Sequence, residues 1–413
     1  MLSPIGRLCL ATVATATLGV VFGAVPLCAQ GLPSEPFVVA GGRVVISGDV
    51  SLTASCSHAP GAALCTEDTG FFNYSDYSDS TIRMARIGLS TAVRLGRRFS
   101  VLGDFRSENA RMPHPYSLYL RFKPFDGRRI DIQAGRIPST FGAFPRRAYS
   151  SDNPLIGFPL AYQYLTSLRA DALPAVADDL IRMRGRGWLS SFPIGNTVPA
   201  VGLPLADAFR QDTGVEVHGA TDRLDIAGSI TAGSLSNPRV GDDNHGKQVA
   251  GRAAVKPRPG LVLGVSASRA PYVASGAALA AHATPNQFVQ RGLGADVEYS
   301  RDHYVVRLES VLSTYELPTI APRLRAVATT LEGRYKLTPR LHVAARLEHL
   351  GFSDVVGSAR TTTWDAPVTQ WETGVGYAVQ RNTQVRVSFQ HHSRDGGRVR
   401  KMTALAGQLL YWF

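Results

Sequence analysis

The sequence predicts an all-β protein, folded as a single up-and-down antiparallel β-barrel that crosses a membrane with about eighteen strands, or with about sixteen. Three observations support this prediction. Apolar and polar residues alternate in segment after segment, short turns and long loops alternate along the chain, and the final residues, ALAGQLLYWF, form one more alternating segment. Because lipid offers no hydrogen bonds, a sheet that spans a membrane must close on itself, with its last strand paired to its first.

The alternation gives each expected strand an apolar face and a polar face. In SLYLRFKPF, residues 117–125, Leu118 and Leu120 lie on one face, and Arg121 and Lys123 lie on the other. We expect the apolar faces to contact lipid and the polar faces to line the lumen. The charged residues expected along the lumen wall are Arg121, Lys123, Arg307, Glu309, Glu332, Arg334, Lys336, Arg346, Glu348 and Arg386.

Basic residues outnumber acidic residues among these candidate pore-lining positions, which predicts a weak preference for anions in a water-filled pore. Acidic and basic residues also stand two apart on one strand, so neighbouring rows of opposite charge would set up a field across the pore. The alternative is that these charges neutralise each other inside a filled barrel.

Two kinds of connection separate the expected strands. Short polar stretches such as 125–129, 193–196 and 337–340 are typical of tight hairpin turns, whereas longer stretches rich in Gly, Ser, Pro and Asn are typical of loops. An even number of strands would place both chain ends at the short-turn, periplasmic end of the barrel. The weakest expected strands are 181–192 and 196–203, and without them the count falls to about sixteen.

The longest expected connection, residues 138–180, is too long for a plain loop and too rich in Pro, Phe, Tyr and Leu for a disordered one. We expect it to fold into the lumen as a constriction that brings Arg146, Arg147 and Asp152 to the pore. The alternative is an external cap over the mouth of the barrel.

The chain begins with a predicted signal peptide, residues 1–29, in which Arg7 precedes an uncharged apolar run and Ala29 offers a small residue for cleavage. A membrane anchor and a lipoprotein acylated on Cys28 are the alternatives. Residues 30–40 are expected to form a short periplasmic tail, and residues 41–413 the barrel.

Composition excludes several classes of protein. The chain is 44% hydrophobic and 18% charged, which excludes disorder, and its formal net charge of +12 favours anionic partners. The basic residues are spread along strands and turns without a cluster, so we expect no nucleic-acid partner. Those in the short turns are expected near lipid headgroups of the membrane.

Cysteine usage predicts a loop disulfide between Cys56 and Cys65 in an oxidising compartment. No Cys/His spacing suggests zinc, and no nucleotide-binding or hydrolase motif occurs, so we expect no metal, no cofactor and no enzymatic activity. The loop GDDNH, with Asp242, Asp243 and His245, is the best candidate for catalysis, although such a run is also typical of an exposed turn.

The C-terminal row of Leu405, Leu409, Tyr411 and Phe413 resembles the assembly signal of Gram-negative outer-membrane porin-type barrels. In that family the terminal aromatic residue and its alternate neighbours are read by the barrel-assembly machinery. A second stretch, IDIQAGRIPSTFGAF at 130–144, is similar to porins of the phosphate-selective type, where a strand ends in Ala-Gly before a long loop. This second resemblance supports a porin-like barrel and does not extend to phosphate selectivity.

The resemblance implies a protein of the cell outer membrane, surrounded by outer-membrane lipid, that lets small polar or anionic solutes diffuse passively. A homotrimer is one oligomeric state that such porins adopt. Two other functions are consistent with the same sequence: a structural or adhesive barrel with a closed lumen, and an outer-membrane hydrolase.

Overall fold

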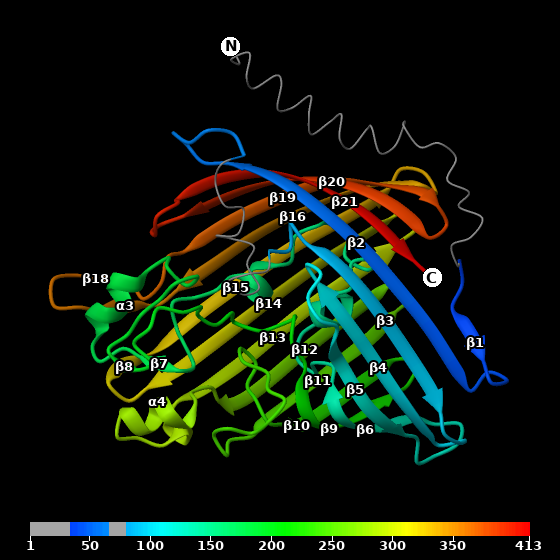
Figure 1. The fold of residues 1–413 in the computed structure, drawn as a ribbon, viewed down its shortest axis with the longest axis horizontal. Coiled ribbons are helices and arrows are strands. Elements are labelled where there is room, and N and C mark those ends of the chain that lie inside the picture. Colours follow the sequence, from blue (N-terminus) through cyan, green and yellow to red (C-terminus); the bar gives the residue numbers. More distant parts are fainter. Residues whose placement is uncertain (1–33, 66–79) are drawn as a thin grey trace, which may run out of the picture.

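A computed structural model describes residues 34–65 and 80–413, and within them sixteen strands close into an antiparallel barrel (Figure 1). The short strand β1 (Phe37–Val39), within the predicted tail, adds to the start of β2. The barrel strands are β2 (Val44–His58), β3 (Ala85–Arg94), β4 (Phe99–Glu108), β5 (His114–Phe122), β6 (Arg129–Ile137), β9 (Asp212–Ala220), β10 (Leu224–Thr231), β11 (Gln248–Arg258), β12 (Leu261–Pro271), β13 (Val289–Arg301), β14 (Tyr304–Leu317), β15 (Ile320–Lys336), β16 (Leu341–Phe352), β19 (Val368–Gln380), β20 (Thr383–Arg394) and β21 (Lys401–Trp412).

The predicted fold class is confirmed, with the alternative count of sixteen strands. Residues 181–192 and 196–203 are not barrel strands: β6 pairs directly with β9, so Ile137 lies opposite Asp212, and residues 138–211 form one long insertion. The turn expected at 193–196 lies inside this insertion. Pro193, Pro199 and Pro204 interrupt the apolar pattern there, and proline cannot donate to a sheet ladder.

The barrel closes where the last strand pairs with the first. Strand β21 runs antiparallel to β2 from Thr403 opposite His58 to Trp412 opposite Asp49. Phe413 then exchanges two backbone hydrogen bonds with Gly48, at 2.9 and 3.1 Å. Figure 1 shows β1 and the C-terminus at one end of the barrel and the helices α3 (Ala177–Met183) and α4 (Ser275–Ala280) at the other.

Exposure is inverted relative to a water-soluble protein. On β16, the apolar Leu347 is 54% exposed on the outer face, while its neighbours Arg346 and Glu348 are each 2% exposed on the inner face. The same inversion recurs around the barrel, with Ile87, Val217, Val265 and many similar residues exposed. An apolar outer belt around a polar interior is stable only in hydrocarbon, so the barrel spans a membrane.

Aromatic side chains gather on strands at the short-turn end of the barrel. Phe99 stacks on Phe122 with ring centroids 4.8 Å apart, and Tyr299 lies 5.8 Å from Tyr304. This band marks the membrane–water interface at that end. Among the described residues, no helix combines the length and apolar character needed to cross a membrane.

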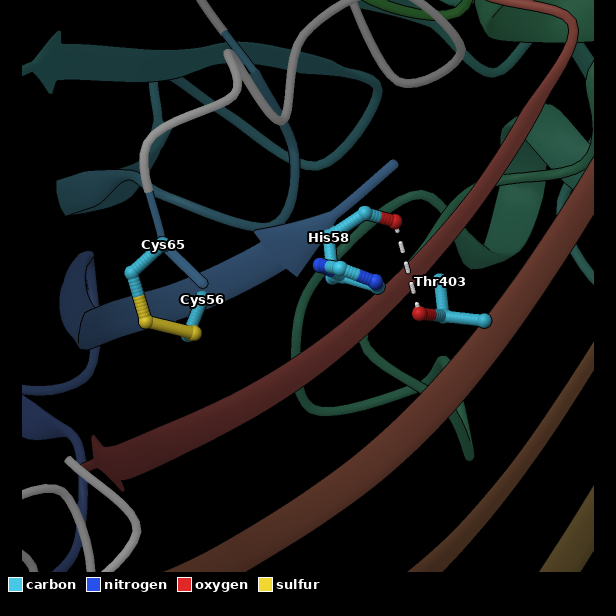
Figure 2. Close-up of a disulfide and its surroundings, with 4 residues drawn as sticks. All are labelled: Cys56, His58, Cys65 and Thr403. Atoms are coloured by element: carbon cyan, nitrogen blue, oxygen red, sulfur yellow. Dashed lines mark hydrogen bonds between the residues drawn. A yellow bond between two sulfur atoms is a disulfide. The ribbon is translucent and has the colours of Figure 1, made fainter. Parts of the chain in front are cut away.

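The predicted signal peptide, residues 1–29, lies outside the described residues. Cys56, near the end of β2, forms a disulfide with Cys65 in the segment that follows (Figure 2). In the same region, the Thr403 hydroxyl of β21 donates to the His58 carbonyl over 3.5 Å.

We expect the refolded, signal-free protein to resist alkylation under non-reducing conditions, because Cys56 and Cys65 are its only two cysteines and are bonded to each other. Intact-mass measurement should show no added alkyl groups in denaturant alone and two after reduction. Two added groups without reduction would contradict the pairing.

Deletion of Phe413 should lower the fraction of protein that refolds into a closed barrel, since it removes two backbone hydrogen bonds, each worth about 1 kcal/mol, and the ring that packs on Gly48 and Phe37. The measurement is the heat-modifiable fraction on an unheated gel after refolding in detergent. Phe125→Ala, at an exposed turn residue, is the matched control. Equal refolding of both variants would show that the seam does not depend on Phe413.

Candidate functional site

The insertion between β6 and β9, residues 138–211, is called the plug segment below. It carries the 3₁₀ turn η3 (Phe144–Arg147), the helices α2 (Leu160–Gln163) and α3, and the short pair β7 (Ala172–Leu173) and β8 (Ile194–Gly195). Most of its buried apolar residues, including Phe144, Phe158 and Tyr162, pack with one another and with the barrel in one large cluster, and Ile156 packs in a second, small cluster with β21. The plug segment therefore has a fixed conformation, which is what its Pro and aromatic content requires.

Five wall residues form a charge ladder across neighbouring strands: Glu298 on β13, Arg307 on β14, Glu332 on β15, Arg346 on β16 and Glu372 on β19. Each lies directly opposite the next in the strand register, so acid and base alternate around the wall. Their ion pairs measure 2.6 Å for Glu298–Arg307, 3.1 Å for Arg307–Glu332, 2.8 Å for Glu332–Arg346 and 3.4 Å for Arg346–Glu372. Opposite charges facing each other across a sheet stabilise that register.

The charge ladder also binds the plug segment. Arg147 of η3 donates to Glu332 over 2.8 Å, so this carboxylate serves both the wall and the plug. The Glu372 carboxylate accepts the backbone N–H groups of Ile156 and Gly157 at 3.2 and 3.1 Å. Arg346 donates to the carbonyl oxygen of Gly157 over 2.8 Å.

Gly157 packs closely against the wall at this contact. A Cβ atom there would lie 2.6 Å from the Gln390 amide nitrogen and 2.8 Å from a Glu372 oxygen. Both distances are shorter than packed atoms tolerate, so a larger residue would displace the ends of the Gln390 and Glu372 side chains.

A second row of wall acids lies beside the charge ladder. Glu309 accepts the Ala143 N–H and the Tyr162 hydroxyl, each at 2.7 Å. Glu348 accepts the Leu160 N–H at 2.9 Å. The sequence suggested that these carboxylates face open water; in the structure both are buried and hold plug groups.

Arg386, on β20, also binds the plug segment. Its guanidinium donates to the Ser150 carbonyl over 2.7 Å and to the Asn153 carbonyl over 2.5 Å. Arg334 lies two residues beyond Glu332 on the same face of β15. The structure thus gathers seven of the predicted pore-lining residues around the plug segment: Arg147, Arg307, Glu309, Glu332, Arg346, Glu348 and Arg386. Their role in lining an open pore stays a prediction.

A basic cavity of about 530 Å³ lies on the other side of the lumen, against β5, β6, β9 and β10. The candidate residues Arg121, Lys123 and Arg146 line it, together with Arg128 and Arg129 from the short turn after β5. Its acidic lining residues are Asp131, Glu216 and Asp225. Five basic side chains face three acidic ones in this lining, so bases exceed acids on this wall.

A histidine in the basic cavity bridges two carboxylates. His218 lies 3.4 Å from Asp131 through Nδ1 and 3.4 Å from Asp225 through Nε2. Arg146 of the plug segment reaches the same Asp225 at 3.5 Å, and Arg121 reaches Asp131 at 3.8 Å. This network ties the start of the plug segment to β10.

Sequence reasoning missed Asp131, His218, Asp225 and Glu372. The signal was present, because all four lie on the polar face of an alternating strand. Extending the period-2 rule to every strand, including 129–137 and 224–231, would have found them.

The later part of the plug segment lies at the long-loop end of the barrel (Figure 1). There Asp365, fully buried before β19, accepts the N–H groups of Ser167 and Gly185, each at 2.7 Å. Burial raises the pKa of this carboxyl, and the backbone donors oppose the rise. The later part of the plug segment is thus fixed at this end of the barrel, and constriction of a pore by residues 138–180 stays a prediction.

The acidic loop proposed for catalysis is engaged in ion pairs. Asp242 pairs with Lys247, and Asp243 pairs with Arg239. Within residues 34–65 and 80–413, no group of three or more His, Cys, Asp or Glu is arranged to hold a metal ion. Nothing in this loop supports a catalytic assignment.

Glu372→Ala should destabilise the barrel by about 1–3 kcal/mol, because it leaves two buried N–H groups and Arg346 short of a partner. Urea unfolding in detergent, followed by tryptophan fluorescence, measures the loss. Glu298→Ala is the control, since its carboxylate is 37% exposed at the outer end of the same charge ladder. A loss no larger than that of the control would show that the plug contacts carry little stability.

No family model matches this chain, and no curated protein matches its sequence. Solved structures do match its fold. OmpT, an outer membrane protein of Vibrio cholerae folded in vitro, superposes with a TM-score of 0.56 at 8% identity, covering 91% of this chain and 99% of that one. An anion-selective porin from Comamonas acidovorans gives 0.54 at 11% identity, covering 90% and 99%.

The outer membrane channel DcaP of Acinetobacter baumannii gives a TM-score of 0.53 at 12% identity, covering 92% of this chain and all of that one. At these identities the likeness is one of fold. It agrees with the closed barrel and the apolar outer belt: the chain has the porin-type fold of outer-membrane β-barrels.

Proposed function

We propose that this protein is a channel through which small polar and anionic solutes diffuse passively across the outer membrane, with the plug segment narrowing its lumen. The observation that carries the proposal is the basic cavity of about 530 Å³ beside the plug segment. It lies inside a barrel whose outer belt is apolar, so it is a polar space at membrane depth.

The charge of this cavity supports a preference for anions. Arg121, Lys123 and Arg146 lie on its wall, and Arg128 and Arg129 extend the basic lining to the short-turn end. A concave surface of one sign, enclosed by low-dielectric walls, raises the local concentration of ions of opposite sign. The anion-selective porin from Comamonas acidovorans shares the fold, which is consistent with this function.

A barrel with a closed lumen is the second candidate, and one observation favours it. Glu332, Arg346 and Glu372 are almost fully buried; the plug backbone bonds to Arg346 and Glu372, and the plug side chain Arg147 bonds to Glu332. Bonding of these wall charges to the plug segment is as consistent with a structural or adhesive barrel as with a narrow channel. Assembly as a homotrimer and recognition by the barrel-assembly machinery stay predictions.

Removal of the plug segment separates the two candidates. Because Ile137 and Asp212 are register partners, residues 138–211 can be replaced by a two-residue Asn-Gly turn that joins β6 to β9 as a hairpin. We expect the wild-type protein to conduct in planar bilayers with an anion-side reversal potential, and the shortened barrel to conduct several-fold more. Heat modifiability checks that the shortened barrel has closed.

Lys123→Gln is the matched variant for selectivity, because it removes one cavity charge and leaves the plug contacts in place. It should move the reversal potential toward zero without a comparable change in conductance. A silent wild type beside a conducting shortened barrel would establish the closed-lumen alternative. Conduction without anion preference would support the proposed channel but contradict the proposal that its basic lining selects anions.

A further inference from the structure

The lipid-facing surface of the barrel has a groove built on a row of small residues. Gly333 on β15, Ala345 on β16 and Thr373 on β19 are register partners, each opposite the next. The row continues to Val306 on β14 and to Phe389 on β20. These residues are called the groove floor.

Larger side chains border the groove floor. Tyr335 and Val375 stand on one side, and Leu331, Leu347 and Trp371 stand on the other, following the alternation of the same strands. The cavity over the groove floor measures about 730 Å³, extends along the Tyr335 and Val375 side, and is lined almost entirely by apolar groups. Because this face lies in hydrocarbon, apolar material must fill the groove or its lining loses dispersion contacts.

One end of the groove reaches a basic rim. Tyr304 and Tyr335, which line the groove, are register partners at the short-turn end, and Arg301 lies opposite Tyr304 on β13. The three neighbouring turns, residues 256–260, 300–304 and 336–341, carry Lys256, Arg258, Arg301, Lys336 and Arg340 and a single acid, Asp302. This rim lies at the level of the lipid headgroups, which the aromatic band marks.

We propose that the groove holds a phospholipid with an anionic headgroup, its acyl chain along the groove floor and its phosphate at Arg301 and Arg340. The two halves of such a lipid match the two parts of the site. Apolar chain fills the floor, and negative charge meets the basic rim, since clustered Lys and Arg at headgroup level attract anionic lipid. This inference rests on the membrane-spanning fold and not on the proposed channel function.

Charge argues for lipid over a second copy of the chain. A symmetric dimer that packs groove against groove sets the basic rim of one copy against the same rim of the other at one depth. An anionic headgroup removes that repulsion.

Filling the groove tests the proposal. Gly333→Leu adds a side chain that has no atom within 4 Å of its Cβ position, so it occupies the groove without a backbone clash. Gly228→Leu is the matched control, because Gly228 also lies on a strand, on β10, with nothing within 4 Å. Thr373→Leu gives a second filled groove if the first variant refolds poorly.

Native mass spectrometry of the detergent-released proteins, titrated with phosphatidylglycerol and separately with phosphatidylcholine, counts bound lipids. We expect wild type and Gly228→Leu to retain one phosphatidylglycerol at concentrations where Gly333→Leu retains at least five-fold less. Equal retention by all three variants would overturn the site. A wild-type multimer that Gly333→Leu converts to monomer, with no retained lipid, would assign the groove to a second copy.

The rim is tested separately. The double variant Arg301→Gln, Arg340→Gln should lose the preference for phosphatidylglycerol over phosphatidylcholine, whereas Arg223→Gln, in the turn between β9 and β10, should keep it. Inorganic phosphate at millimolar concentration should not displace the lipid, since the acyl chain supplies part of the binding. Displacement by phosphate alone would show that only the basic rim binds an anion, and it would contradict the proposal that the groove binds the acyl chain.

Discussion

The buried charges of the lumen wall depend on the backbone of the plug segment. Glu372 and Glu348 lie out of water, and each would be costly there without partners. The N–H groups of Ile156, Gly157 and Leu160 supply those partners. The dependence is mutual, because plug N–H groups buried in a lumen also need acceptors.

The charge ladder provides one of these acceptors, Glu372, and with Arg147 of the plug segment its three acids are matched by three bases. Glu332 stands between Arg307 and Arg346 on the wall and accepts Arg147 from the plug segment, so three cations share one carboxylate. Truncating one member of such a network leaves the others buried without compensation, which costs more than the pair contributes. The network therefore specifies where the plug segment sits.

The fold could be predicted from the sequence because one face of the sheet contacts lipid and the other contacts polar groups. Lipid outside and polar groups inside impose period 2 on every strand, and hairpin geometry imposes the alternation of turns and loops. Strands 302–315 and 324–337 were visible in this way. The same rule failed at 181–192 and 196–203, where the residues belong to the plug segment at the long-loop end and not to the barrel sheet.

The candidate site was predictable in composition and not in arrangement. Alternation placed Arg307, Glu332 and Arg346 on the polar face, but their pairing depends on the register of neighbouring strands, which no local pattern gives. Whether Glu309 meets water or the Tyr162 hydroxyl depends on contacts between segments more than a hundred residues apart. Long-range contacts of this kind leave no local trace in a single sequence.

The attachment of the plug segment divides the lumen into two unequal sides. The segment leaves the wall at β6 and returns at β9, yet it bonds to β14, β15, β16 and β19, so it crosses the interior. Two cavities lie on the side of the barrel where the plug segment is attached to the wall. One is the basic cavity, and the other is a smaller cavity of about 190 Å³ lined by Ser47, Asp104 and Tyr149. Tyr119 of β5 lines both cavities. A solute path in the proposed channel therefore passes this tyrosine, between the smaller cavity and the basic cavity.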